Sequence, residues 1–190
     1  GYGGSCFQKD LLNLIYLCEH FNLPEVARYW RGVVEINAYQ KRRFAESVID
    51  SLYRNICGKR LAIFGFAFKE DTNDTRESPA IDICRLFLNE RAQLAVFDPK
   101  VSKKQVFADL NVEEGDPRVE FCPSPYEAAE KAHAIVLLTQ WKEFKNLDYK
   151  KIKSAMATPA WIFDGRNCLD HRLLGELGFL LRGIGKGNLS

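Results

Sequence analysis

The sequence predicts an α/β protein in which an N-terminal helical segment with one long helix precedes a doubly wound parallel sheet. Three observations predict this class. Residues 24 to 55 keep an apolar face at helical spacing, interrupted only by Gly32. After Gly58, short apolar runs of strand length alternate with helix starts. The run from residue 134 to 139 lacks polar alternation, which is typical of a strand covered on both faces.

The N-terminal segment, residues 1 to 57, is expected to hold a Gly-rich loop, a short helix and the long helix. Pro24 stands where a first helical residue would stand. About 30 helical residues would span about 45 Å, more than one small domain needs. Two interpretations stay open, a surface helix with one apolar face and a helix that packs against a second copy. The run Lys41-Arg42-Arg43 is interpreted as its solvated face.

The second segment, residues 58 to 190, is expected to form the sheet. Helix starts are predicted at Ser78-Pro79 and Ser124-Pro125, where a capping hydroxyl precedes a proline. A further helix is predicted at residues 173 to 177. The predicted strands are residues 60 to 66, 94 to 97, 121 to 122, 134 to 139, 161 to 163 and 179 to 184.

Composition excludes several classes of function. The chain has 190 residues and a net charge of +2, which favours neither nucleic acid nor a membrane surface as a partner. No apolar run approaches the roughly 20 residues that a membrane span needs. The six cysteines show no zinc spacing, so we expect no metal and a reducing, cytoplasmic location. Because the sequence opens at Gly1, inside a motif, we expect a fragment.

The first motif is Gly1-Tyr2-Gly3-Gly4-Ser5-Cys6-Phe7-Gln8-Lys9-Asp10. Ser5 is expected to cap a helix whose first turn holds Cys6, where the helix dipole favours a thiolate. Lys9 and Asp10 follow three and four residues later and share a helix face with Cys6. Nucleophile, cation and base on one turn are a catalytic arrangement. A cysteine at a helix start is otherwise a packing residue, and that interpretation stays open.

Two further motifs follow strands. Residues 65 to 79 read GFAFKEDTNDTRESP and lack the glycine fingerprint of dinucleotide sites, but contain Lys69 and Arg76. Such cations suit phosphate or ribose groups at the carboxyl edge of a parallel sheet. Phe163-Asp164-Gly165-Arg166 ends a later strand, so Arg166 is expected at the same edge. The alternatives are a solvated, ion-paired loop and a structural arginine.

Taken together and in this order, the three motifs resemble those of the nucleotide-sugar 6-dehydrogenases, in the form found in the UDP-glucose 6-dehydrogenases of animals and plants. The resemblance covers essentially the whole chain. It implies a Rossmann-like UDP-sugar-binding domain at residues 58 to 190. It implies oxidation of UDP-glucose to UDP-glucuronate by two NAD, and a homo-oligomer, at least a dimer, built through the long helix. The main NAD-binding domain is expected to precede Gly1, so this chain alone is expected to be inactive.

The resemblance also implies roles for single residues. Cys6 matches the nucleophile, which captures an aldehyde as a thiohemiacetal and carries the later thioester. Lys9 matches a residue near the cofactor, and Asp10 a carboxylate that assists water or proton transfer. Cofactor contacts are implied for Cys6, Lys9 and Arg76. Substrate contacts are implied for Gly1, Tyr2, Gly3, Phe68, Lys69 and Arg166. Tyr2 departs from the phenylalanine that is frequent in the family, but keeps the ring.

Two other hypotheses remain beside the dehydrogenase. One is a non-catalytic nucleotide-sugar-binding module in which Cys6 is incidental. The other is a dimerisation helix attached to a degenerate α/β domain. Replacing Cys6 by serine separates the first from an enzyme, since a binding module would lose nothing. A dimer that binds no UDP-glucose would favour the second.

Overall fold

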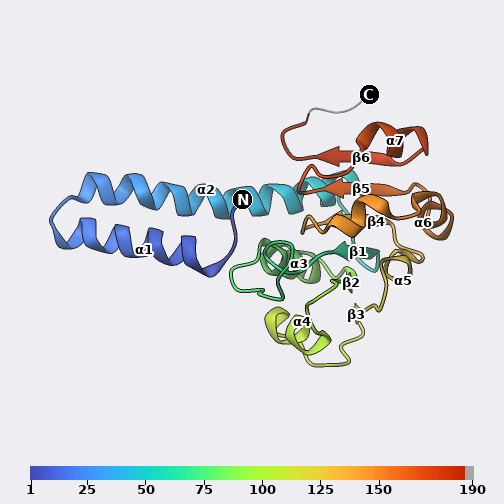
Figure 1. Ribbon diagram of the computed structural model, residues 1–190, viewed down its shortest axis with the longest axis horizontal. Coiled ribbons are helices and arrows are strands. Elements are labelled where there is room, and N and C mark those ends of the chain that lie inside the picture. Colours follow the sequence, from blue (N-terminus) through green and yellow to red (C-terminus); the bar gives the residue numbers. More distant parts are fainter. Residues whose placement is uncertain (187–190) are drawn as a thin grey trace.

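The protein is described here over residues 1–186 by a computed structural model, in which a pair of helices projects from an α/β body (Figure 1). The elements in chain order are α1 (Ser5–His20), α2 (Pro24–Ser51), β1 (Arg60–Phe64), α3 (Pro79–Asn89), β2 (Gln93–Phe97), α4 (Lys103–Leu110), β3 (Val119–Phe121), α5 (Pro125–Ala129), β4 (Ala134–Leu137), η1 (Lys142–Asn146), α6 (Tyr149–Ala155), β5 (Trp161–Asp164), α7 (His171–Glu176) and β6 (Leu180–Gly183).

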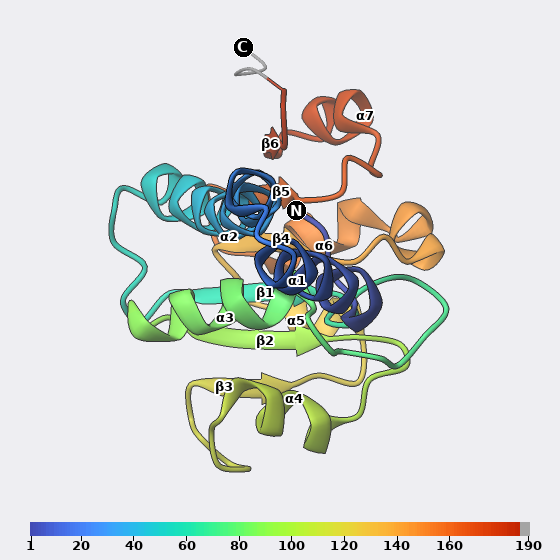
Figure 2. The same cartoon turned by 90° about the vertical axis from the view of Figure 1, so that its left-hand side faces the viewer.

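The two N-terminal helices form an antiparallel hairpin. A turn at Asn22, whose φ is 57°, reverses the chain between α1 and α2. Ile15, Cys18 and Ala27 form a small core between the two helices. Figure 2 looks along the hairpin and shows both helices in front of the sheet. This small core contrasts with the C-terminal part of α2, where Phe44 and Val48 join the main core.

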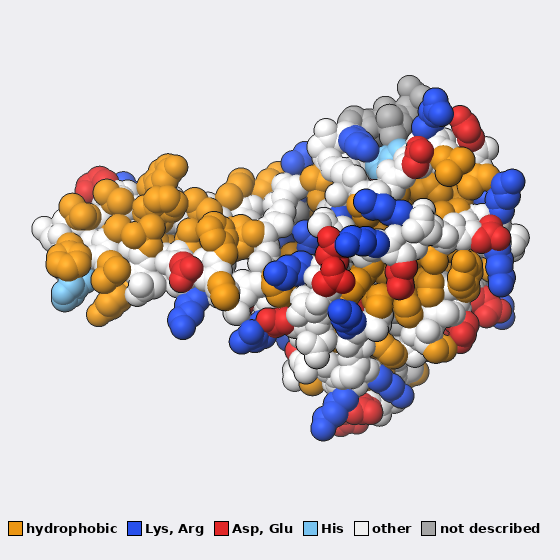
Figure 3. Space-filling view, viewed as in Figure 1, with side chains coloured by type: hydrophobic (Ala, Val, Ile, Leu, Met, Phe, Trp, Pro, Cys, Tyr) orange, Lys and Arg blue, Asp and Glu red, His pale blue; other side chains and the backbone are white. Residues whose placement is uncertain are grey.

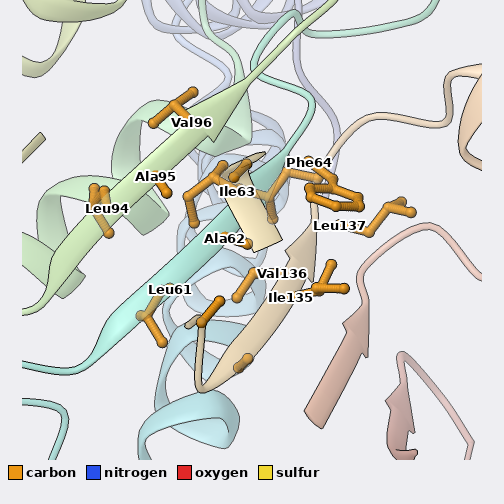
Figure 4. Close-up of a cluster of buried hydrophobic side chains, with 14 of the residues drawn as sticks. Leu61, Ala62, Ile63, Phe64, Leu94, Ala95, Val96, Ile135, Val136 and Leu137 are labelled. Carbon is orange, nitrogen blue, oxygen red and sulfur yellow. The ribbon is translucent and has the colours of Figure 1, made fainter. Parts of the chain in front are cut away.

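All six strands are parallel, in the order β3-β2-β1-β4-β5-β6. The chain winds outward from β1 to one edge, returns to β4 beside β1, and winds outward to the other edge. Figure 4 shows the buried aliphatic side chains of β1, β2 and β4 at the centre of the sheet. Ile63 pairs in register with Val96 and Val136, and all three are fully buried. Burial on both faces explains why these strands read as unbroken apolar runs.

The predicted fold class is confirmed, and the differences concern local features. Helix α2 ends at Ser51, a few residues before the predicted end. Helices α4 and α6 and the 3-10 helix η1 were not predicted from the sequence. Lys41 is not simply solvated, because its side chain is 10% exposed and pairs with Asp82 of α3 at 2.7 Å. No helix within residues 1–186 is long and apolar enough to span a membrane.

Candidate functional site

The candidate site lies where the winding of the sheet reverses, between the carboxyl ends of β1 and β4. Open parallel sheets bind ligands at this point, because the loops that follow the two central strands diverge there. Gly65 follows β1 with a φ of 86°, and Thr139 follows β4. A Cβ on Gly65 would lie 2.4 Å from the Cβ of Thr139, so only glycine fits. The segments that follow β1 and β4 are therefore closely packed at this edge.

A buried carboxylate shapes the loop after β1. Asp98, which is 3% exposed, accepts hydrogen bonds at Oδ2 from the backbone N–H of Phe66 at 2.7 Å and of Ala67 at 3.0 Å. The indole N–H of Trp141 donates to the same oxygen at 3.1 Å. Asp98 therefore fixes the course of the chain toward Phe68. Sequence reasoning had read this aspartate only as the end of a strand.

The loop of Gly1 to Gly4 packs directly against the loop that follows β1. A Cβ on Gly4 would lie 2.8 Å from the ring of Phe68, and a Cβ on Gly3 would lie 2.6 Å from Pro79. Gly4 also has a φ of 91°, which side chains other than hydrogen rarely tolerate. The structure thus brings Gly3 and Gly4 against the segment from Phe68 to Pro79, although the two segments are distant in sequence. The predicted substrate residues Gly1 and Tyr2 lie against Asn37 of α2 instead.

Cys6 lies in the first turn of α1 as predicted, but Ser5 does not cap that helix. The N-cap residue is Gly4, with no side-chain cap, and Ser5 is the first helical residue. The reason is that the positive φ of Gly4 turns the chain one residue earlier. Cys6 is exposed and forms no disulfide within residues 1–186. An accessible thiol at a helix start has the geometry of a nucleophile.

Lys9 and Asp10 are exposed on α1, and within residues 1–186 neither side chain has a hydrogen bond or an ion pair. Arg76 pairs with Asp74 through Nη2 at 2.8 Å and Nε at 3.0 Å. This pair raises the pKa of Arg76, to which the nearby Cys6 adds a smaller contribution, and it lowers the pKa of Asp74. Arg76 is 73% exposed, so it faces solvent near Cys6.

Arg166 reaches the same edge from the end of β5. Its Nε donates to the carbonyl oxygen of Leu138 at 2.6 Å, and its Nη2 to that of Phe68 at 3.4 Å. Burial lowers the pKa of its guanidinium. Asp164 holds the turn, because its Oδ1 accepts the N–H of Arg166 at 3.0 Å. Lys69 lies with its Nζ 5.3 Å from the centre of the Phe68 ring.

Two features of the site were missed from the sequence. Asn37 of α2, which is 6% exposed, forms hydrogen bonds with both the N–H and the carbonyl oxygen of Tyr2. The signal in the sequence was a polar residue within the apolar face of the predicted helix. A basic groove of about 370 Å³ also lies between α2 and the end of β6. Its cationic lining residues are Arg43, Arg182 and Lys186. Neither residue type nor spacing pointed to this groove.

The loop after β1 does not have the sequence of a dinucleotide-binding turn. The loop after β1 lacks a glycine fingerprint and presents Phe68, Lys69 and Arg76 instead. Within residues 1–186, no cluster of three or more histidine, cysteine or carboxylate side chains could hold a metal ion.

Comparison with known proteins agrees with this geometry. The profile of the UDP-glucose/GDP-mannose dehydrogenase family, UDP binding domain, matches residues 62–171. The UDP-glucose 6-dehydrogenase of Drosophila melanogaster is 50% identical over 193 residues, covering 98% of this chain and 40% of that protein. The corresponding protein of Pongo abelii is 52% identical over 194 residues, covering 98% of this chain and 39% of that protein. This chain thus spans about 40% of the length of these relatives.

Solved structures give the same result. A UDP-glucose dehydrogenase from Pyrobaculum islandicum superimposes with a TM-score of 0.66 at 30% identity, over 78% of this chain and 32% of that one. An NDP-N-acetyl-D-galactosaminuronic acid dehydrogenase from Methanosarcina mazei superimposes with a TM-score of 0.73 over 99% of this chain and 39% of that one. At 24% identity, the second likeness shows the fold alone. The chain therefore belongs to the UDP-glucose/GDP-mannose dehydrogenase family.

Proposed function

We propose that the protein containing this chain oxidises UDP-glucose to UDP-glucuronate with two NAD, and that residues 58 to 190 bind the UDP-sugar. The observation that carries the proposal is the packing of the loop before Cys6 against Phe68. This packing puts an accessible thiol next to the sheet edge where α/β proteins bind ligands. The 50% identity to a UDP-glucose 6-dehydrogenase supports the choice of substrate.

In the proposed reaction the sugar C6 alcohol first loses a hydride and a proton and becomes an aldehyde. The thiol of Cys6 adds to the aldehyde and forms a thiohemiacetal, which can give up a second hydride and become a thioester. Water then releases the carboxylate and restores the thiol. NAD, when bound, accepts the two hydrides. The balance is one UDP-glucose, two NAD⁺ and one water converted to UDP-glucuronate, two NADH and three protons.

The chain's own residues are assigned to distinct tasks. Cys6 holds the aldehyde so that it stays bound between the two oxidations. Asp10, four residues later on α1, orients the attacking water or accepts its proton, and Lys9 stands near the cofactor. Gly1, Tyr2 and Gly3 line the sugar nucleotide with their backbone, and Phe68, Lys69 and Arg166 contact it. Arg76, exposed near Cys6, contacts the cofactor.

The proposal extends to assembly and location. Residues 1 to 57 are assigned to the catalytic loop and to a connector that forms at least a dimer through α2. The exposed apolar side chains of the helical hairpin support this assignment. The protein is proposed to be cytoplasmic, with neither nucleic acid nor a membrane as partner and without a metal. The chain by itself is proposed to be inactive, so NADH formed from UDP-glucose and NAD by the purified 190-residue chain would contradict that part.

The test is the number of NADH formed per UDP-glucose by the intact protein, with GDP-mannose as the control substrate. We expect about two NADH per UDP-glucose and none from GDP-mannose. Cys6→Ser should abolish UDP-glucuronate formation, because serine has no stable thiohemiacetal or thioester to offer. Cys57→Ser, at another exposed cysteine, is the matched control and should retain activity. Unchanged turnover in Cys6→Ser would instead favour the binding module with an incidental cysteine.

A further inference from the structure

Asn37 stands out as a polar side chain on the buried face of a long helix. The other buried residues of α2 are Ala27, Phe44, Ala45 and Val48, all apolar. Asn37 lies on the helix surface that faces the loop of Gly1 to Gly4, and the residue is 6% exposed. A buried amide is costly unless its donors and acceptors are paired, so its partners indicate its role.

The partners of Asn37 are both backbone groups of a single residue, 35 positions earlier in the sequence. The N–H of Tyr2 donates to Oδ1 at 2.7 Å, and Nδ2 donates to the carbonyl oxygen of Tyr2 at 3.2 Å. This two-point contact fixes both the position and the orientation of the peptide chain at Tyr2. The side chain of Tyr2 takes no part in these two hydrogen bonds, so the contact involves only the backbone of Tyr2.

The opposite side of the loop is held as tightly. Gly3 meets Pro79 and the carbonyl oxygen of Glu77, and Gly4 meets the ring of Phe68, at distances that leave no room for a Cβ. The loop is thus held between α2 and residues 68 to 79, with Asn37 as its polar anchor. Cys6 follows Tyr2 by four residues, and helix α1 begins at Ser5 in between. The course of the loop therefore determines where the thiol lies relative to Phe68.

We propose that Asn37 is a positioning residue that holds the loop of Gly1 to Gly4 and thereby places Cys6 against the sheet edge. The inference rests on the proposed function for the chemistry of Cys6, but the contact that carries it does not. Asn37 touches no reacting atom. It acts through Tyr2, and its loss should impair the step that needs the thiol, the capture and second oxidation of the aldehyde.

Amide hydrogen exchange in the intact protein tests the anchor itself. In Asn37→Ala the N–H of Tyr2 loses its acceptor, so a peptide covering residues 2 to 6 should exchange at least threefold faster. Asn37→Asp keeps an acceptor but no donor, and should give a smaller increase. Glu35→Ala, at an exposed position of the same helix, is the matched control and should leave the peptide unchanged. Exchange within twofold of the unaltered protein in both Asn37 variants would overturn the proposal.

The ratio of NADH to UDP-glucuronate separates positioning from simple loss of stability. A destabilised enzyme works more slowly but still forms two NADH per UDP-glucuronate. A misplaced thiol lets the aldehyde escape after one oxidation, so with semicarbazide present as a trap the ratio should rise above two in Asn37→Ala and stay at two in Glu35→Ala. A ratio of two in both folded Asn37 variants would overturn the positioning role. If the unaltered protein forms no NADH from UDP-glucose, the proposed function fails and the exchange measurement alone decides.

Discussion

At the scale of single residues, two buried carboxylates at the candidate edge accept hydrogen bonds from the backbone of the neighbouring loops. Asp98 binds the chain after β1, and Asp164 binds the N–H groups of Arg166 at 3.0 Å and Leu169 at 2.9 Å. Hydrogen bonds from several N–H groups satisfy charges that would otherwise be costly to bury. Carboxylates whose oxygens are paired in this way restrict the loops at the edge to one conformation.

Another polar contact joins β1 to β4 and makes stability depend on pH. The N–H of Arg60 donates to Nδ1 of His133 at 3.3 Å, which requires a neutral ring. Burial, with Lys59 nearby, lowers the pKa of His133 below its usual 6.5. Below that pH the unfolded chain takes up a proton that the folded chain resists. Stability should therefore fall as pH drops from about 6.5 through the folded-state pKa.

His133→Asn should remove this part of the pH dependence, since the Asn oxygen can accept the same hydrogen bond without titrating. Urea unfolding of the chain at pH 7.5, 6.5 and 5.5 measures it. The slope of unfolding free energy against pH should decrease in His133→Asn, whereas His20→Asn, at an exposed position of α1, should keep the original slope. Equal slopes in the unaltered chain and in His133→Asn would show that Arg60 and His133 are not coupled in this way.

At the scale of elements, the sequence determined helices and strands where burial pattern and capping agree. The central strands were predicted because both faces are buried. Helices α3 and α5 were predicted because Ser78 and Ser124 cap them, accepting hydrogen bonds from the N–H of Ala80 and of Glu127. Helices α4 and α6 were missed because they are only eight and seven residues long, too short for a clear helical period. The start of α1 was misjudged at Ser5, because the φ of 91° at Gly4 is not visible in residue type alone.

The candidate site was predictable in part for a related reason. Motifs after successive strands converge at one edge of a parallel sheet, so Phe68 and Arg166 were expected together, and they are linked at 3.4 Å. The approach of Gly3 and Gly4 to that edge depends on how α2 packs against the α/β body, because Asn37 of α2 holds the adjacent Tyr2. The role of Asn37 depends on the same geometry. No local pattern encodes such a long-range contact, so sequence reasoning placed Asn37 on a helix and gave it no role.

The turn from β1 into the site loop makes a prediction for an element boundary. Gly65→Ala would place a methyl group 2.4 Å from the Cβ of Thr139 and would force alanine to a φ of 86°. Strain and overpacking cost roughly 1–3 kcal/mol each, so the free energy of unfolding should drop by about 2–6 kcal/mol. Gly58→Ala has a similar φ of 70° but open space around its Cβ, so it should lose only the strain contribution, about 1–2 kcal/mol.

Urea unfolding of the two glycine variants separates crowding from backbone strain. Both substitutions require a positive φ, so a difference between them measures the clash with Thr139. Equal losses in Gly65→Ala and Gly58→Ala would mean that the edge relaxes and that its close packing is not essential. A larger loss in Gly65→Ala would support a rigid edge, which a site that binds a sugar nucleotide needs for orientation.

At the scale of the whole molecule, the helical hairpin exposes more apolar surface than an isolated protein would. Within residues 1–186, ten of the thirteen large apolar side chains that are exposed lie between residues 7 and 39. Figure 3 shows many of them, in orange, over the projecting hairpin. The hairpin's own core consists of only three buried residues and their neighbours. An apolar surface of this kind marks an interface, so the hairpin should be stable in contact with a second copy.

Ile36, 60% exposed, lies near the middle of α2 and belongs to the exposed apolar surface of the hairpin. Ile36→Glu would bury a charge against the partner copy, so the dimer dissociation constant should rise by at least tenfold. Sedimentation velocity over a range of protein concentrations measures it. Leu173→Glu makes a comparable change at a 52% exposed residue of α7 and should leave the dimer intact.

The same pair of variants tests whether assembly and site are connected through α2. Ile36 lies beside the anchor of the catalytic loop, so separation of the copies should loosen that loop as well. Hydrogen exchange in residues 2 to 6 should then accelerate in Ile36→Glu but not in Leu173→Glu. A monomeric Ile36→Glu with an unchanged loop would confine the partner's role to stability. If the unaltered protein is a monomer, the proposed dimer is wrong and the exposed apolar face has another cause.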